Sequence, residues 1–275
     1  MFGLPWHILL PTLLGSLLAG ILCSLMGTLV VRMKLSSLGF AMSHAAFAGA
    51  ALGLMLSIAE PLWLALAFSL LTAAVLGPLT DASRLNADTV LGAVFPLTMA
   101  LGLVFINKSP SAGVGSGALS LLWGSVLGIT TNEVLLLGAV LLAVVATLAL
   151  FGKGFLALLL DRKLAQATGI NTRAAFYAVL FLVAVVVAVS MRVTGGLLIY
   201  ALMVLPATAA FQWAYDIKKV FLLAPAFGVG ASVAGFILSL AADLPIGSSI
   251  ALCAAGLFLL STALSPKRRR ARFAG

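Results

Sequence analysis

Nine stretches of mostly apolar residues, separated by short polar breaks, run through almost the whole chain. A helix that crosses the hydrocarbon core of a bilayer needs about 20 such residues. Only 8% of the 275 residues are charged and 63% are hydrophobic, so a soluble domain is not expected. The sequence therefore predicts an all-α, polytopic membrane helix bundle of about nine transmembrane helices. The stretches cover approximately residues 8–31, 39–58, 61–80, 89–107, 133–151, 174–194, 197–214, 220–241 and 247–264.

Basic residues follow every odd-numbered stretch, whereas the even-numbered breaks are poor in positive charge. Short loops rich in Lys and Arg stay in the cytoplasm. This pattern predicts an N-terminus outside and a C-terminus in the cytoplasm. We expect one transmembrane domain over residues 1–265, followed by a basic cytoplasmic tail over 266–275. Directly after a span, such a tail indicates topology and contact with anionic lipid rather than nucleic-acid binding.

His44 is the clearest ionisable residue inside a predicted span. Ionisable groups there are costly and by default mark a functional path. A neutral imidazole could bind a passing divalent metal, and an interhelical hydrogen bond without a ligand role fits His44 equally well. Gly49 and Gly53 follow on the same span, and their spacing favours close approach of another helix.

Three other polar or helix-breaking features stand out. Asp88 is expected to be the N-cap of the fourth span. Arg192 with Gly195-Gly196 indicates a helix break on the outer side, and Pro206 should loosen the seventh span because proline removes a backbone hydrogen bond.

The segment 155–173 is predicted to be the only long cytoplasmic loop, and it mixes apolar and charged residues. Within it, Asp161 to Gly169 has the pattern of a short amphipathic helix closed by a C-terminal glycine. The apolar side of such a helix needs a partner, which could be lipid headgroups or a cytoplasmic protein.

The chain has no glycine-rich loop followed by Lys-Ser/Thr, so it lacks that nucleotide-binding motif. Energy for transport would come from another subunit or from an ion gradient. An ion-coupled secondary transporter should carry a carboxylate within the membrane, whereas every Asp and Glu here lies at or near the end of a predicted span. An enzyme should show several converging polar residues, and only His44 is available.

In several segments, in the same order, the sequence resembles the zinc/manganese/iron permeases of ATP-binding-cassette (ABC) importers. The resemblance covers nearly the whole length and rests on residues 39–53, Asp88-Thr89-Val90-Leu91-Gly92, residues 164–170, residues 193–198 with 205–210, and Pro245-Ile246-Gly247.

The resemblance implies a permease in the bacterial inner membrane that carries a metal ion as substrate, without enzymatic activity or a bound cofactor of its own. Expected partners are a cytoplasmic ATPase dimer, an extracytoplasmic metal-binding protein and a second copy of the chain. The implied metal pathway contains Met42, Ser43 and His44; the implied pathway or gate contains Phe40, Gly49, Gly53 and Pro206; and the implied ATPase coupling element, within 155–173, contains Asp161, Leu164, Ala167 and Gly169.

Phe40 departs from the family motif, which usually has aspartate at this position. Without that carboxylate, a site at His44 has a softer and less charged set of ligands. Zinc, manganese, iron and a chelated metal or cofactor therefore all remain candidate cargoes.

Overall fold

The computed structural model describes residues 6–83, 85–109, 129–160, 162–167 and 169–267. In these residues the chain is helical and contains no strand, and nine of the helices are long and apolar enough to cross a membrane. The predicted fold class and number of spans are confirmed for this part of the chain. The helices are α1 (Trp6–Arg32), α2 (Leu38–Met55), α3 (Leu62–Ser83), α4 (Ala87–Asn107), α6 (Thr131–Leu160), α7 (Arg162–Ala167), α8 (Thr172–Thr194), α9 (Gly196–Trp213), α10 (Ile217–Ala242) and α11 (Ile246–Leu264).

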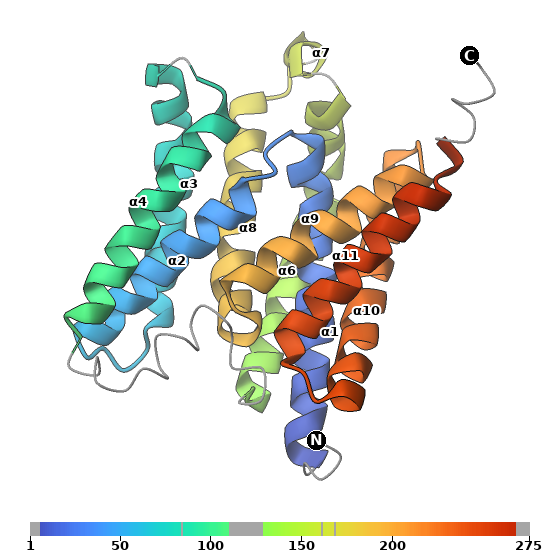
Figure 1. Ribbon diagram of the computed structural model, residues 1–275. Helices are drawn as coiled ribbons and strands as arrows, with labels where there is room; N and C mark the ends of the chain where they lie inside the picture. The colour runs from blue at the N-terminus through green and yellow to red at the C-terminus, as the bar shows by residue number, and fades with distance from the viewer. Residues whose placement is uncertain (1–5, 84, 110–128, 161, 168, 268–275) are drawn as a thin grey trace.

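Helix α2 is the most enclosed of the spans. It packs against α3 and α4 on one side and against α8 and α9 on the other, and 78% of its apolar stretch is buried, compared with 11% for α6. Figure 1 shows α2 crossing between the α3–α4 pair and the rest of the bundle. The exposed leucines of α6 suit contact with lipid chains, whereas α2 carries its residues into the protein interior.

The start of α1 and the end of α11 lie at opposite ends of the bundle, as an odd number of spans requires (Figure 1). The short helix α7 lies at the same end as the end of α11 (Figure 1). The segment containing α7 and the C-terminal end of the bundle would therefore face the same side of a membrane.

Glycines on α2 allow α3 to approach closely. A Cβ atom at Gly49 would lie 2.1 Å from the carbonyl oxygen of Leu64, and one at Gly53 would lie 3.0 Å from the Cα of Pro61. The close helix approach predicted from the Gly49–Gly53 spacing is confirmed. Small residues serve the same purpose between α1 and α10, where a Cβ at Gly228 would lie 2.5 Å from the carbonyl oxygen of Gly20.

Gly49→Ala should lower the stability of the folded protein, because the new methyl group would overlap the rigid backbone of α3. Overpacking of this kind costs about 1–3 kcal/mol. Gly138→Ala on α6 is the matched control, since a Cβ there meets nothing within 4 Å. Thermal unfolding in detergent should show a lower midpoint for Gly49→Ala only, and equal midpoints for both variants would contradict the close packing of α2 on α3.

Two local expectations need correction. Asp88 is not the N-cap of α4: that position is Asn86, and Asp88 lies in the first turn. Its Oδ1 instead accepts a hydrogen bond of 2.9 Å from the backbone N–H of Ser37, just before α2. This carboxylate therefore satisfies a free donor at the start of a neighbouring helix, a pairing that depends on the tertiary fold.

The predicted loop over 155–173 is shorter in the structure. Helix α6 continues to Leu160 and α8 begins at Thr172. The apolar residues 155–160 therefore prolong the fifth span. Helix α6 has 30 residues and is about 45 Å long, so its last turns extend beyond a hydrocarbon core of about 30 Å.

The predicted helix break between α8 and α9 is confirmed at Gly195, whose φ of 77° and ψ of 158° suit glycine alone. Beside this break, Arg192 forms ion pairs of 3.1 Å with both Glu60 and Glu133. The three charges come from breaks that the charge pattern assigns to the outer side. Their meeting at one end of the bundle supports the order of the spans.

Candidate functional site

His44 lies on the enclosed helix α2 and is 5% exposed. Its Nδ1 lies 2.8 Å from the carbonyl oxygen of Phe40, one turn earlier. A carbonyl oxygen can only accept, so Nδ1 carries the proton in this hydrogen bond. In the neutral ring the lone pair is then on Nε2, which is the arrangement found in metal-binding histidines.

Two aromatic rings contact the imidazole, and a third ring packs against one of them. The ring centroids of Phe40 and Phe95 each lie 4.6 Å from that of His44, in edge-to-face geometry. Phe40 also contacts Phe95 at 4.4 Å and Tyr200 at 5.3 Å. We call these four residues the α2 aromatic cluster: it joins α2, α4 and α9 around one histidine.

Ser43 belongs to the same neighbourhood. Its hydroxyl donates to the carbonyl oxygen of Phe40 at 2.8 Å and lies 3.4 Å from His44 Nδ1. A Cβ at Gly196, the first residue of α9, would lie 3.5 Å from the Ser43 hydroxyl oxygen. Ser43 therefore faces the start of α9, directly after the Gly195 break.

Met42, Gly49, Gly53 and Pro206 are not placed together with His44 by any described contact. The Met42 side chain is fully buried in the apolar core, and its carbonyl accepts from Ser69 on α3. Gly49 and Gly53 face α3. Pro206 is buried within α9, which continues as one helix through it. Their assignment to a pathway or gate stays a prediction.

Phe95 and Tyr200 were not predicted as site residues. Each is one aromatic residue among many apolar neighbours in its span, and only the packing of α4 and α9 on α2 brings Phe95 to His44 and Tyr200 to Phe40. The one weak signal in the sequence is the position of Tyr200 just after Gly195-Gly196, where a helix begins.

The described residues contain no group of three or more His, Cys, Asp or Glu side chains that could hold a metal ion. The described contacts of His44 are with two aromatic rings, one hydroxyl and one backbone carbonyl. Within the described residues, this arrangement could offer a passing ion one imidazole nitrogen and weak oxygen ligands, but not a tight site of charged ligands.

The predicted coupling residues lie around α7. Gly169 has a φ of 80°, and the backbone N–H groups of Gly169 and Ile170 donate to the carbonyls of Gln166 and Ala165, so the predicted C-terminal glycine of this helix is confirmed. Gln166 also donates to the Thr172 hydroxyl at 2.9 Å, which ties α7 to α8. Ala167 is exposed and Leu164 lies within α7, whereas Asp161 lies outside the described residues.

Comparison with known proteins places this fold among transport proteins. The chain matches the family model described as "ABC 3 transport family" over residues 6–265. It is 30% identical to the manganese import system permease protein ScaB of Streptococcus gordonii, over 96% of this chain and 94% of that protein. It is 28% identical to the high-affinity zinc uptake system membrane protein ZnuB of Haemophilus influenzae, over 93% and 97% of the two chains.

A solved structure shares the whole architecture. The chain is similar to a chain of PsaBC from Streptococcus pneumoniae, solved in complex with a Fab, with a TM-score of 0.87 and 28% identity. The similarity covers 98% of this chain and 96% of that one. The bundle is therefore matched from end to end.

Proposed function

Because the chain belongs to the ABC 3 transport family, we propose that it is the membrane permease of an ATP-driven importer that brings a transition-metal ion into the cell. The family match over residues 6–265 carries this proposal. Relatives named for manganese import and for zinc uptake, each matched over more than nine-tenths of its length, make these two metals the first cargoes to test, with iron as a third.

An import permease of this kind depends on partners. We propose a dimer of the chain with two cytoplasmic ATPase subunits, which supply the energy, and an extracytoplasmic protein that delivers the metal. Helix α7 is the proposed docking element for the ATPase: it is short, it is tied to α8 through Gln166, and Ala167 is exposed on it. Movement of a docked ATPase would then reach α8 directly.

We propose that the protein spans the bacterial inner membrane with its N-terminus outside and its C-terminus in the cytoplasm. Cysteine labelling tests this orientation in a background where Cys23 and Cys253 are replaced by alanine. Ile58→Cys should react with a membrane-impermeant maleimide on intact spheroplasts, whereas Lys219→Cys should react only after the membrane is opened. Both positions are exposed and lie outside the spans or at a span end. The reverse labelling pattern would overturn the orientation.

The proposed metal route passes the α2 aromatic cluster, with Nε2 of His44 as the transient ligand. Burial of His44 and the hydrogen bond that leaves its Nε2 lone pair available support this role. The single imidazole, whose described contacts include no carboxylate, suits brief contact with an ion that must leave again.

A chelated metal is the second candidate cargo, and the α2 aromatic cluster favours it. Phe40, Phe95 and Tyr200 present apolar surface where tight binding of a bare ion would call for carboxylates. An organic chelate would gain from contact with these rings.

Metal uptake in cells distinguishes these cargoes. A strain without its own manganese and zinc importers would express the permease with its ATPase and binding protein. We expect accumulation of radioactive manganese or zinc, supplied as the free ion, to rise above that of the empty strain. Uptake only in the presence of a chelator would favour the second candidate, and no uptake of either form, with the complex present in the membrane, would overturn the proposal.

A further inference from the structure

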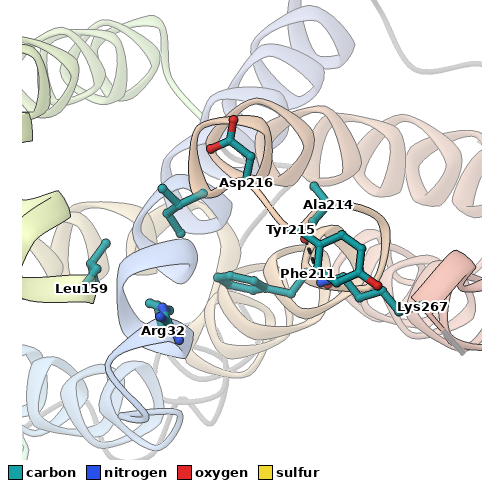
Figure 2. Close-up of a pocket in the computed structure, with 8 residues that line it drawn as sticks. Arg32, Leu159, Phe211, Ala214, Tyr215, Asp216 and Lys267 are labelled. Carbon is teal, nitrogen blue, oxygen red and sulfur yellow. Dashed lines mark hydrogen bonds between the residues drawn. The ribbon is translucent and has the colours of Figure 1, made fainter. Parts of the chain in front are cut away.

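A cavity of about 480 Å³ lies at the end of the bundle where α1 ends, α10 begins and the chain leaves α11. Arg32 is the last residue of α1, Asp216 directly precedes α10, and Lys267 follows α11. In the view of Figure 2, Arg32 and Lys267 lie on either side of Phe211. On the orientation proposed above, this cavity lies at the cytoplasmic surface of the membrane.

Most charged groups at this cavity already have partners. The Lys267 ammonium donates to the carbonyl oxygens of Phe211 and Ala214, at 2.5 and 2.8 Å, and lies 4.2 Å from the centre of the Tyr215 ring. An oxygen of Asp216 accepts from the backbone N–H of Lys218 at 3.0 Å. In contrast, the exposed Arg32 guanidinium has no hydrogen bond or ion pair with any described residue. Among the described residues that line this cavity, Arg32 is thus the cation that is free to bind an anion.

The remaining walls are apolar. Leu159, Phe211 and Ile217 line the cavity beside the charged groups. Tyr215 and Trp213, which are 72% and 44% exposed, lie at the same end of α9, and such aromatic residues typically occupy the headgroup level of a bilayer. The described lining of the cavity therefore combines the unpaired Arg32 guanidinium with apolar walls.

We propose that this cavity binds the headgroup of an anionic phospholipid, with the Arg32 guanidinium donating to the phosphate. A planar guanidinium can donate two parallel hydrogen bonds to phosphate oxygens. Basic pockets between spanning helices on the cytoplasmic side are suited to such headgroups. The apolar walls would contact the glycerol and upper acyl carbons, which a free phosphate ion lacks. Lys267, which donates to backbone carbonyls at the end of α9, lines the side of the cavity away from Arg32.

The test uses the purified full-length permease with its ATPase, reconstituted in nanodiscs of phosphatidylcholine with increasing phosphatidylglycerol. Native mass spectrometry would count the phosphatidylglycerol molecules retained, a readout that does not depend on transport. Arg32→Gln removes the free guanidinium. Lys219→Gln is the matched control: it makes the same change of charge at an exposed position in the first turn of α10 that does not line the cavity.

We expect Arg32→Gln to retain a tightly bound phosphatidylglycerol about five-fold less often than the unmodified protein, as the loss of one basic residue at a membrane surface implies. Lys219→Gln should retain it normally. An equal loss in both variants would show only diffuse charge attraction and would overturn the proposal. Unchanged retention in Arg32→Gln would also overturn the proposal, as would displacement of the lipid by inorganic phosphate at millimolar concentration. Release of the ATPase by Arg32→Gln in lipid-free detergent would overturn it too, because that result would assign the cavity to protein docking.

Discussion

His44→Ala should abolish metal uptake while the amount of folded protein in the membrane stays normal. The change removes the buried imidazole from α2, and with it the Nε2 atom proposed as a transient metal ligand. The measurement is uptake of radioactive manganese or zinc, normalised to permease extracted as a monodisperse complex. A purely structural histidine would instead cost about 1 kcal/mol of stability and leave uptake near normal. Full uptake by His44→Ala would remove this residue from the metal route.

The companion change Phe40→Asp restores a carboxylate one helical turn before His44. Phe40 contacts His44, Phe95 and Tyr200, so an aspartate here would enter the α2 aromatic cluster. Beside an imidazole it would form a more charged ligand pair. We expect tighter metal binding or a changed preference between manganese and zinc, measured by competition in the uptake assay. A change in expression alone, with unaltered ion preference, would count against this cluster as the route.

Replacing Leu164 and Ala167 with aspartate should release the ATPase from the purified permease while the spans stay folded. Both residues lie on α7, where new carboxylates would disturb an apolar contact with a docked protein. Co-purification through a tag on the permease measures the loss. Ala242→Asp is the control for the change at Ala167, because it places the same new carboxylate at an exposed helix end far along the chain from α7. Normal ATPase recovery and transport in the double variant would exclude α7 from the interface.

The spans were predictable because their signal is local. A run of about 20 apolar residues between polar breaks specifies a membrane helix by itself, and the nine described spans begin and end close to the predicted positions. The exception is α6, where the apolar residues after Lys153 belong to a helix that extends past the membrane core rather than to a loop. Asp88 was misassigned for a different reason, since its partner Ser37 is distant in sequence.

The site was predictable only in part. A histidine in a span is conspicuous because burial of an ionisable group is costly, so His44 could be selected from the sequence. Phe95 and Tyr200 carry no such signal: the contact of Phe95 with His44 and that of Tyr200 with Phe40 depend on how α4 and α9 pack against α2. Residues next to His44 in sequence predict its surroundings only in part: Ser43 lies beside the imidazole, but successive residues on a helix point to different sides. The side chain of Met42, two residues before His44, is instead buried in the apolar core.

Transport by purified components tests the central claim most directly. The permease, its ATPase and its binding protein would be reconstituted in proteoliposomes, with ATP supplied on the ATPase side and radioactive manganese or zinc on the binding-protein side. If this chain imports metal, the radioactive metal should accumulate inside the vesicles, and this accumulation should require ATP, the binding protein and an intact His44. Accumulation without ATP, or ATP hydrolysis stimulated by the loaded binding protein with no metal entering the vesicles, would contradict it.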